Sequence, residues 1–220
     1  GKVWIAVTSQ AAIDSVAKNL HENDFSKIQG RFETRITMTS SNADDVIKKR
    51  LLEKKESHFN TLESYYAGSK VEINNLLALV QFGESKVAYA NESEFAEIYP
   101  FVSYQFKLMQ SILETIRKSG YSGKHLAQGE RSLLSAFKEA SEIIADKPLG
   151  SLVPFYLFYD TIDSFLDFNV KKTINQVRDD AQYDEADLKV LKTLFLLKDI
   201  KGLRPDIDTL VTLFAANVSD

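Results

Sequence analysis

The sequence predicts a mainly α-helical protein with a small strand portion at its N-terminal end. Two observations lead to this fold class. After residue 43 the apolar side chains recur almost entirely with the 3.6-residue period of helices that pack on one face. Runs with strand character are confined to residues 3–7 and 34–39. The 220 residues, 44% of them hydrophobic, are enough for one large core or two small ones.

The first predicted strand, residues 3–7, is a nearly continuous apolar run, typical of a strand buried on both faces of a parallel sheet. Since only one other strand is predicted nearby, the sheet is expected to lack strands that would precede this chain. Thr8, Ser9 and Gln10 follow at the C-terminal end of the strand, where open α/β sheets bind ligands. Thr8 or Ser9 could equally cap a helix over residues 11–20.

The second predicted strand lies between an arginine and a helix. Gly30 allows a tight turn just before Arg31, and residues 34–39 alternate as in a strand buried on one face. The capping residues 40–42 then predict the start of a helix over residues 43–55. Its predicted apolar stripe is Val46, Ile47, Leu51 and Leu52, and its predicted i,i+4 pairs are Asp44 with Lys48 and Asp45 with Lys49.

The rest of the chain predicts further helices. They cover residues 71–82, 101–119, 131–144, 152–180, 188–200 and 206–218, with a loop or short helix at 85–96. The aromatic-rich run 152–168 could be a binding face, but aromatic residues at helical spacing are far more often core, and we interpret them so. The last two helices flank a turn at Gly202 and Pro205. They could open a helix-turn-helix or winged-helix unit, although any antiparallel helix pair gives this pattern.

The loop of residues 119–131 is the most site-like segment. It combines three glycines with Lys124, His125 and Arg131, which could offer backbone amides and positive charge to a phosphate. It is not a Walker A motif, because Lys118 stands where that motif needs glycine and His125 where it needs a hydroxyl. The alternative is an ordinary glycine turn followed by solvated residues in the first turn of a helix.

Composition and spacing argue against several kinds of protein. The net charge of -4 gives no global basic field, so contact with DNA would need a local patch. The absence of cysteine excludes disulfides and cysteine-bound zinc, and it fits a reducing cytoplasm. The three histidines lack ligand spacing, so no metal site is predicted. Neither a signal peptide nor a membrane span is predicted, and we expect a cytoplasmic protein.

Six segments together resemble the P-loop ATPases of BREX phage-defence systems. They are VWIAVTSQ at 3–10, FSKIQGRF at 25–32, ADDVIKKRLLEKK at 43–55, YPFVSYQFKLMQ at 99–110, SGKHLAQGERSLLSAF at 122–137 and LVPFYLFYDTIDSFL at 152–166. The resemblance implies the part of an AAA+-like module that follows its Walker motifs. Residues 1–40 would end the αβα nucleotide-binding core, 41–180 would form a helical lid-like bundle, and 181–220 would be a partial winged-helix-like segment.

The same resemblance implies roles for individual residues. Thr8, Ser9 and Gln10 would occupy the sensor-1 position, Arg31 would be an arginine finger, and Arg131 would be a sensor-2-like arginine. Lys124 and His125 are candidates for contact with the nucleotide from the composition of their loop, and not from the resemblance.

The implied cofactor is ATP with Mg²⁺ in the full-length parent, with none bound to this fragment, which alone is expected to be inactive. Expected partners are the upstream Walker-containing part, further copies in a homo-oligomer, and other defence proteins, with DNA possible and no membrane. The alternative is a helical module that binds protein or DNA through Arg31 and the basic residues 48–55 and has no nucleotide role.

Overall fold

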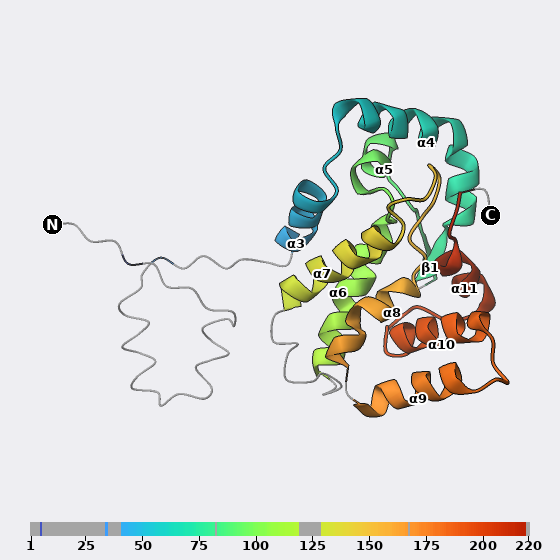
Figure 1. Ribbon diagram of the computed structural model, residues 1–220. Coiled ribbons are helices and arrows are strands. Elements are labelled where there is room, and N and C mark those ends of the chain that lie inside the picture. The colour runs from blue at the N-terminus through green and yellow to red at the C-terminus, as the bar shows by residue number, and fades with distance from the viewer. Residues whose placement is uncertain are drawn as a thin grey trace. The chain divides into compact units, whose positions relative to one another are not determined.

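The computed structural model describes residues 5, 34, 41–81, 83–118, 129–166 and 168–218 (Figure 1). Contacts within the chain divide it into two compact units, residues 1–42 and 43–220. The described helices and strands belong to the second unit, except that the first helix begins at Ser41. The predicted strands 3–7 and 34–39 lie outside the described residues apart from Ile5 and Thr34. Both residues are exposed and neither belongs to a strand.

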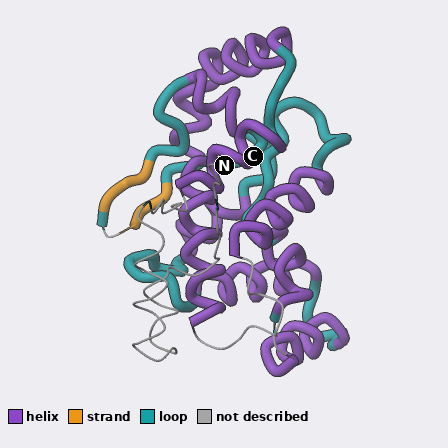
Figure 2. Tube along the Cα trace, turned by 90° about the vertical axis from the view of Figure 1, so that its left-hand side faces the viewer, coloured by secondary structure: helices purple, strands orange, loops and turns teal. Residues whose placement is uncertain are grey.

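The second unit is mainly α-helical, as the sequence predicts. Its helices are α3 (Ser41–Val46), the π-helix η1 (Ile47–Leu51), α4 (Glu56–Leu76), α5 (Glu92–Ile98), α6 (Ser103–Lys118), α7 (Gly129–Ile143), α8 (Leu157–Ile162), the 3-10 helix η2 (Asp163–Phe165), α9 (Phe168–Asp179), α10 (Glu185–Leu197) and α11 (Ile207–Phe214). Two short strands, β1 (Leu79–Gln81) and β2 (Glu84–Lys86), form one antiparallel hairpin. Figure 2 shows this hairpin at the edge of a body built otherwise of helices and loops.

The core lies around α6 and α7, which pack side by side in the middle of the unit (Figure 1). The predicted face of α6 is buried, at Phe106, Met109, Leu113 and Ile116. Phe137 of α7 is the centre of an aromatic cluster, with ring centroids 4.5 Å from Phe106, 4.7 Å from Phe101 and 5.1 Å from Phe158. The interpretation of the aromatic run 152–168 as core is confirmed for Phe155, Phe158 and Tyr159, which are fully buried, but it is wrong for Phe168, which is 75% exposed.

A second aromatic cluster joins α4 to α5. The Phe95 ring stacks on Tyr66 at 5.0 Å between centroids and meets the edge of Tyr89 at 4.9 Å. All three side chains are at most 2% exposed. Aromatic pairs of this kind add about 0.5–1.5 kcal/mol beyond the area they bury, so the cluster fixes α5 against the long helix α4.

The predicted helix 71–82 is wrong in its second half. Helix α4 continues through Gly68, with a kink at Ser69, but ends at Leu76, and residues 79–81 are a strand. The chain reverses at Gly83, whose φ of 79° suits a residue without Cβ. Gln81 forms an isolated bridge to Leu203, which lies far away in the sequence. Local apolar periodicity could not show this pairing, so the prediction that strands occur only at 3–7 and 34–39 is also wrong.

The predicted helix 43–55 is shorter and less regular than expected. The α-helical part ends at Val46, the π turn follows, and residues 53–55 are not helical. Within the predicted stripe, Ile47 and Leu52 are buried, but Val46 is 43% exposed. The i→i+5 bond from Leu52 N to Ile47 O, 3.1 Å long, marks the wider turn.

The predicted continuous helix over 152–180 is divided. Residues 152–154 are not helical, as expected next to Pro154, and they bond distant groups. Leu152 N donates to Ala216 O at 2.9 Å, and the buried Gln105 Nε2 donates to Val153 O at 2.9 Å. Helix α8 ends at Ile162. The polar residues predicted to continue this helix to residue 180 form the separate helix α9.

The last two predicted helices both exist, but α10 begins and ends three residues earlier than the predicted 188–200, and α11 ends at Phe214 and not at residue 218. Asp184 caps α10, since its carboxylate accepts from Asp187 N at 2.9 Å while Asp187 accepts from Asp184 N at 3.0 Å. Asp206 caps α11 by accepting from Thr209 N at 2.9 Å. Helix α10 packs on α8 and α9, and α11 packs on β1. None of the helices in the described ranges is long and apolar enough to cross a membrane.

Candidate functional site

Most of the site residues predicted from the sequence lie outside the described part of the chain. These are Thr8, Ser9, Gln10, Arg31, Lys124 and His125. Arg131 is placed by its backbone alone, in the first turn of α7, which begins at Gly129. Helix α7, which carries Arg131 in its first turn, packs against α6, α8 and the π turn η1. It therefore belongs to the packed helices of the core.

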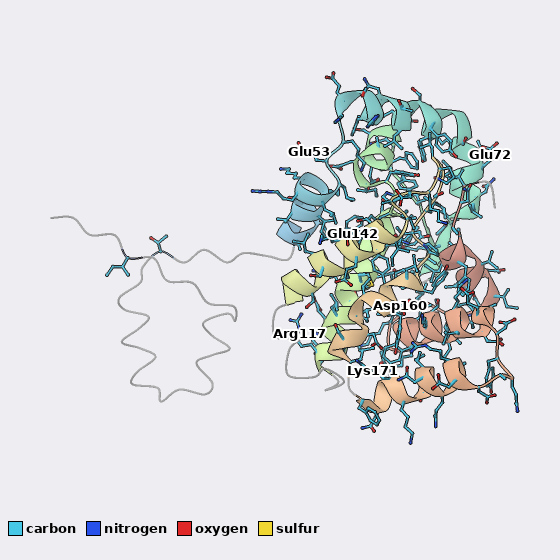
Figure 3. The ribbon with its side chains drawn as sticks, in the orientation of Figure 1. Glu53, Glu72, Arg117, Glu142, Asp160 and Lys171 are labelled. Carbon is cyan, nitrogen blue, oxygen red and sulfur yellow. The ribbon has the colours of Figure 1, made fainter. Side chains whose placement is uncertain are left out.

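The most site-like feature within the described residues is a basic patch formed by Lys48, Lys49, Arg50, Lys54 and Lys55. Its first three cations are consecutive residues of η1, and the last two lie on the segment that leads into α4. Figure 3 marks that segment at Glu53. Lys49, Arg50 and Lys55 are exposed, and within the described ranges none of them has an ion pair or a side-chain hydrogen bond.

The π turn explains how Lys49 and Arg50 are exposed while Lys48, partly buried, contacts Glu97. Ile47 is fully buried and Leu52 is 6% exposed, so the apolar anchors stand at the two ends of the turn. The i→i+5 bond between them adds one residue to the usual helical turn. Ile47 and Leu52 are both buried, and the residues Lys48, Lys49 and Arg50 lie between them in the sequence. None of these three side chains therefore has to enter the core. The sequence shows the charge run but not this wider turn.

Lys48 and Lys54 are held by Glu97 at the end of α5. The Lys48 Nζ lies 3.3 Å from Glu97 Oε2, and the Lys54 Nζ donates to the backbone oxygen of Glu97 at 2.8 Å. Burial lowers the pKa of Lys54 to about 8, although the charge of Glu97 acts in the opposite direction. Sequence reasoning missed Glu97, because a partner 43 residues from Lys54 leaves no local signal.

The predicted pairs of Asp44 with Lys48 and of Asp45 with Lys49 do not form ion pairs among the described residues. The change from α to π spacing at Ile47 removes the i,i+4 geometry, and Lys48 turns to Glu97 instead. Burial raises the pKa of Asp44, an effect that the charge of Lys48 partly offsets. One oxygen of Asp44 is enclosed and finds no hydrogen-bond partner in this part of the structure.

A second group of charges joins α8 and η2 to their neighbours. The buried Lys192 of α10 bonds both oxygens of Asp160, at 2.7 and 2.9 Å, and Lys171 of α9 lies 3.3 Å from Asp163 (Figure 3). Burial and the nearby charge of Asp163 raise the pKa of Tyr159. Because each carboxylate here already has a cation, the group acts as a set of structural ties between helices.

The described residues offer neither a cavity large enough for a nucleotide nor a candidate metal site. A cavity of about 10 Å³, lined by Ile112, Ile116, Phe195 and Ile200 among others, has room for about one water molecule and none for a nucleotide. Within the ranges that the structure describes, no group of three or more metal-ligating side chains comes together.

No family model matches the sequence. No solved structure matches the fold.

Proposed function

We propose that this chain is the part of a P-loop, AAA+-like ATPase that follows the Walker motifs, similar to the ATPases of BREX phage-defence systems. Residues 1–40 would complete the nucleotide core, 41–180 would be the lid-like bundle, and 181–220 would be a partial winged-helix-like segment. ATP and Mg²⁺ would bind in the assembled parent, with other copies and defence proteins as partners. This chain alone would not hydrolyse ATP.

The observation that carries this proposal is the place of Arg131 in the first turn of α7. The first backbone amides of a helix have no partner within it, and the helix dipole makes this end favourable for an anion. An arginine at that position, directly after the segment with Lys124 and His125, is suited to a nucleotide phosphate. Arg131 lies at the start of the 15-residue helix α7, which packs on α6 and α8. Such an arrangement is consistent with a helical lid.

In this proposal the predicted residues have distinct tasks. Arg131 would bind the phosphates in the ground state, while Arg31 would contact the nucleotide of a neighbouring subunit only as charge develops in the transition state. Thr8, Ser9 and Gln10 would position the attacking water.

Arginine substitutions in the full-length, assembled protein test these tasks. Arg31→Ala should lower ATP turnover by about 10³-fold while leaving nucleotide affinity nearly unchanged, because the finger acts in the transition state. Arg131→Ala should weaken both nucleotide affinity and turnover. Steady-state ATPase rates and titration with labelled ATP measure the two quantities separately.

Arg35→Ala is the control for these variants, since residue 35 lies in the predicted strand and not at its end. It should change turnover little. Equal losses for all three variants, together with lower thermal stability, would mean that these arginines stabilise the fold and do not take part in hydrolysis.

A second function, the helical interaction module without nucleotide, is favoured by the basic patch. Lys49, Arg50 and Lys55 are exposed and have no ion pair among the described residues, so they are available to a partner. A charge run is usually only a solvated face, and for this reason the function stands second. If ATP binds neither the parent nor any assembly of it, this second function takes the place of the first.

A further inference from the structure

We propose that the basic patch binds the phosphate backbone of double-stranded nucleic acid without reading its sequence. The surface that would do so is formed by Lys49, Arg50 and Lys55, with Lys48 and Lys54 behind them. This inference goes beyond the proposed ATPase role, because it needs neither a nucleotide nor the Walker-containing part.

The positive charge that this surface offers lies in three exposed cations. Residues 44–56 contain five cations and four carboxylates, Asp44, Asp45, Glu53 and Glu56, and Glu97 pairs with Lys48. Lys48 and Lys54 are tied to Glu97 and keep the turn in place. The three exposed cations have no such ties in the part of the chain described, so binding a phosphate would not require breaking an ion pair.

The geometry suits phosphates along a backbone. The π turn is fastened at Ile47 and Leu52, so the cations between these residues are displayed on a fixed turn. The guanidinium of Arg50 can bind a phosphate through two parallel hydrogen bonds, while Lys49 and Lys55 supply point charges beside it. Positively charged side chains of this kind position a protein on a duplex but carry no sequence information.

The composition of the surface favours a duplex over the other polyanions. Single-stranded nucleic acid is bound largely by stacking on aromatic rings, and residues 46–55 contain no aromatic residue. The centres of protein interfaces are rich in Trp, Tyr and Arg packed in dry pockets. Here the only strongly exposed apolar side chain is Val46, at 43%. Exposed cations without ion pairs are expected to bind phosphates through counterion release.

Fluorescence anisotropy with a labelled duplex of random sequence, about 30 base pairs long, tests this proposal on the whole chain in the absence of ATP. The wild type should bind with a Kd of about 10⁻⁴–10⁻⁶ M, and binding should weaken steeply between about 50 and 200 mM salt. Combining Lys49→Ala, Arg50→Ala and Lys55→Ala should weaken binding at least about tenfold at the lower salt. It should also reduce the slope of log K against log salt by about 2.7, or 0.9 for each lost contact.

The matched control combines Lys147→Ala, Lys172→Ala and Arg204→Ala. These residues are also exposed, and the same three charges are removed from other parts of the surface. The control should keep nearly wild-type affinity and slope, and circular dichroism should show that both triple variants are folded.

Three results would overturn the proposal: no binding by the wild type, equal losses in the two triple variants, or equal displacement by polyglutamate at the same charge concentration. The last would assign the surface to an acidic protein. Because ATP is absent, each result is independent of the arginine experiments above.

Discussion

At the scale of single residues, the pKa of Lys54 shows the effect of burial on a charged side chain. Its amine is held at the backbone oxygen of Glu97, and burial lowers its pKa from 10.5 to about 8. Between these values the unfolded chain keeps a proton on Lys54 that the folded chain has released. The unfolded state therefore binds more protons, and stability should rise with pH in this window.

We expect the free energy of unfolding to increase by on the order of 1–2 kcal/mol between about pH 8 and pH 10 because of Lys54. Above pH 10 the opposite trend should set in, since burial raises the pKa of Tyr89 and Tyr104 and the folded chain then holds protons that the unfolded chain loses. Urea denaturation at several pH values measures both trends.

Lys54→Met should remove the increase, and Lys55→Met, a change at the exposed neighbour, should leave it in place. If the two variants have the same pH dependence, Lys54 does not experience the burial described here.

At the scale of elements, backbone conformation separates two glycines that otherwise look alike. A Cβ added to Gly68 or to Gly83 would meet no atom within 4 Å. Gly68 lies inside helix α4, whereas Gly83 has a φ of 79° in the turn of the β-hairpin. The conformation of the backbone, and not the available space, should therefore decide how each position responds to alanine.

Gly68→Ala should raise the free energy of unfolding by about 0.5–1 kcal/mol, because alanine restricts the unfolded chain and suits a helix. Gly83→Ala should lower it by about 1 kcal/mol or more, because alanine is strained at positive φ. The midpoints of urea unfolding should move in opposite directions. A shift of both midpoints in the same direction would contradict the assignment of a helix to the first site and a hairpin turn to the second.

At the scale of the whole molecule, the second unit contains its own core. Both aromatic clusters, around Phe137 and around Phe95, are formed by residues after position 42. A chain that buries its large side chains within one contiguous segment can fold without the rest.

We therefore expect a fragment of residues 41–220 to fold alone, with a thermal midpoint within about 4 °C of that of the full chain, a shift that corresponds to about 1–2 kcal/mol at most. Near-ultraviolet circular dichroism should report the same aromatic packing in both. A fragment that unfolds non-cooperatively would show that residues 1–40 supply part of this core.

The sequence by itself determined the features that depend on neighbours along the chain. The buried face of α6 follows from apolar spacing, and the start of α11 follows from the carboxylate of Asp206, which bonds an amide three residues away. Asp184 caps α10 in the same local way, but the predicted helix began only at residue 188. The charge run of the basic patch is visible in the same way. These signals are local because a helix forms its hydrogen bonds within itself.

Only the tertiary structure decided the features whose partners are distant. Residues 79–81 are a strand because they pair with β2 and bridge to Leu203, and helical periodicity in the same residues could not show this. The exposure of Lys49 and Arg50 depends on how the π turn η1 packs against α7. The contacts of Glu97 with Lys48 and Lys54 likewise join α5 to a distant segment. Burial, pKa and partner are properties of packing, which brings together residues that the sequence keeps apart.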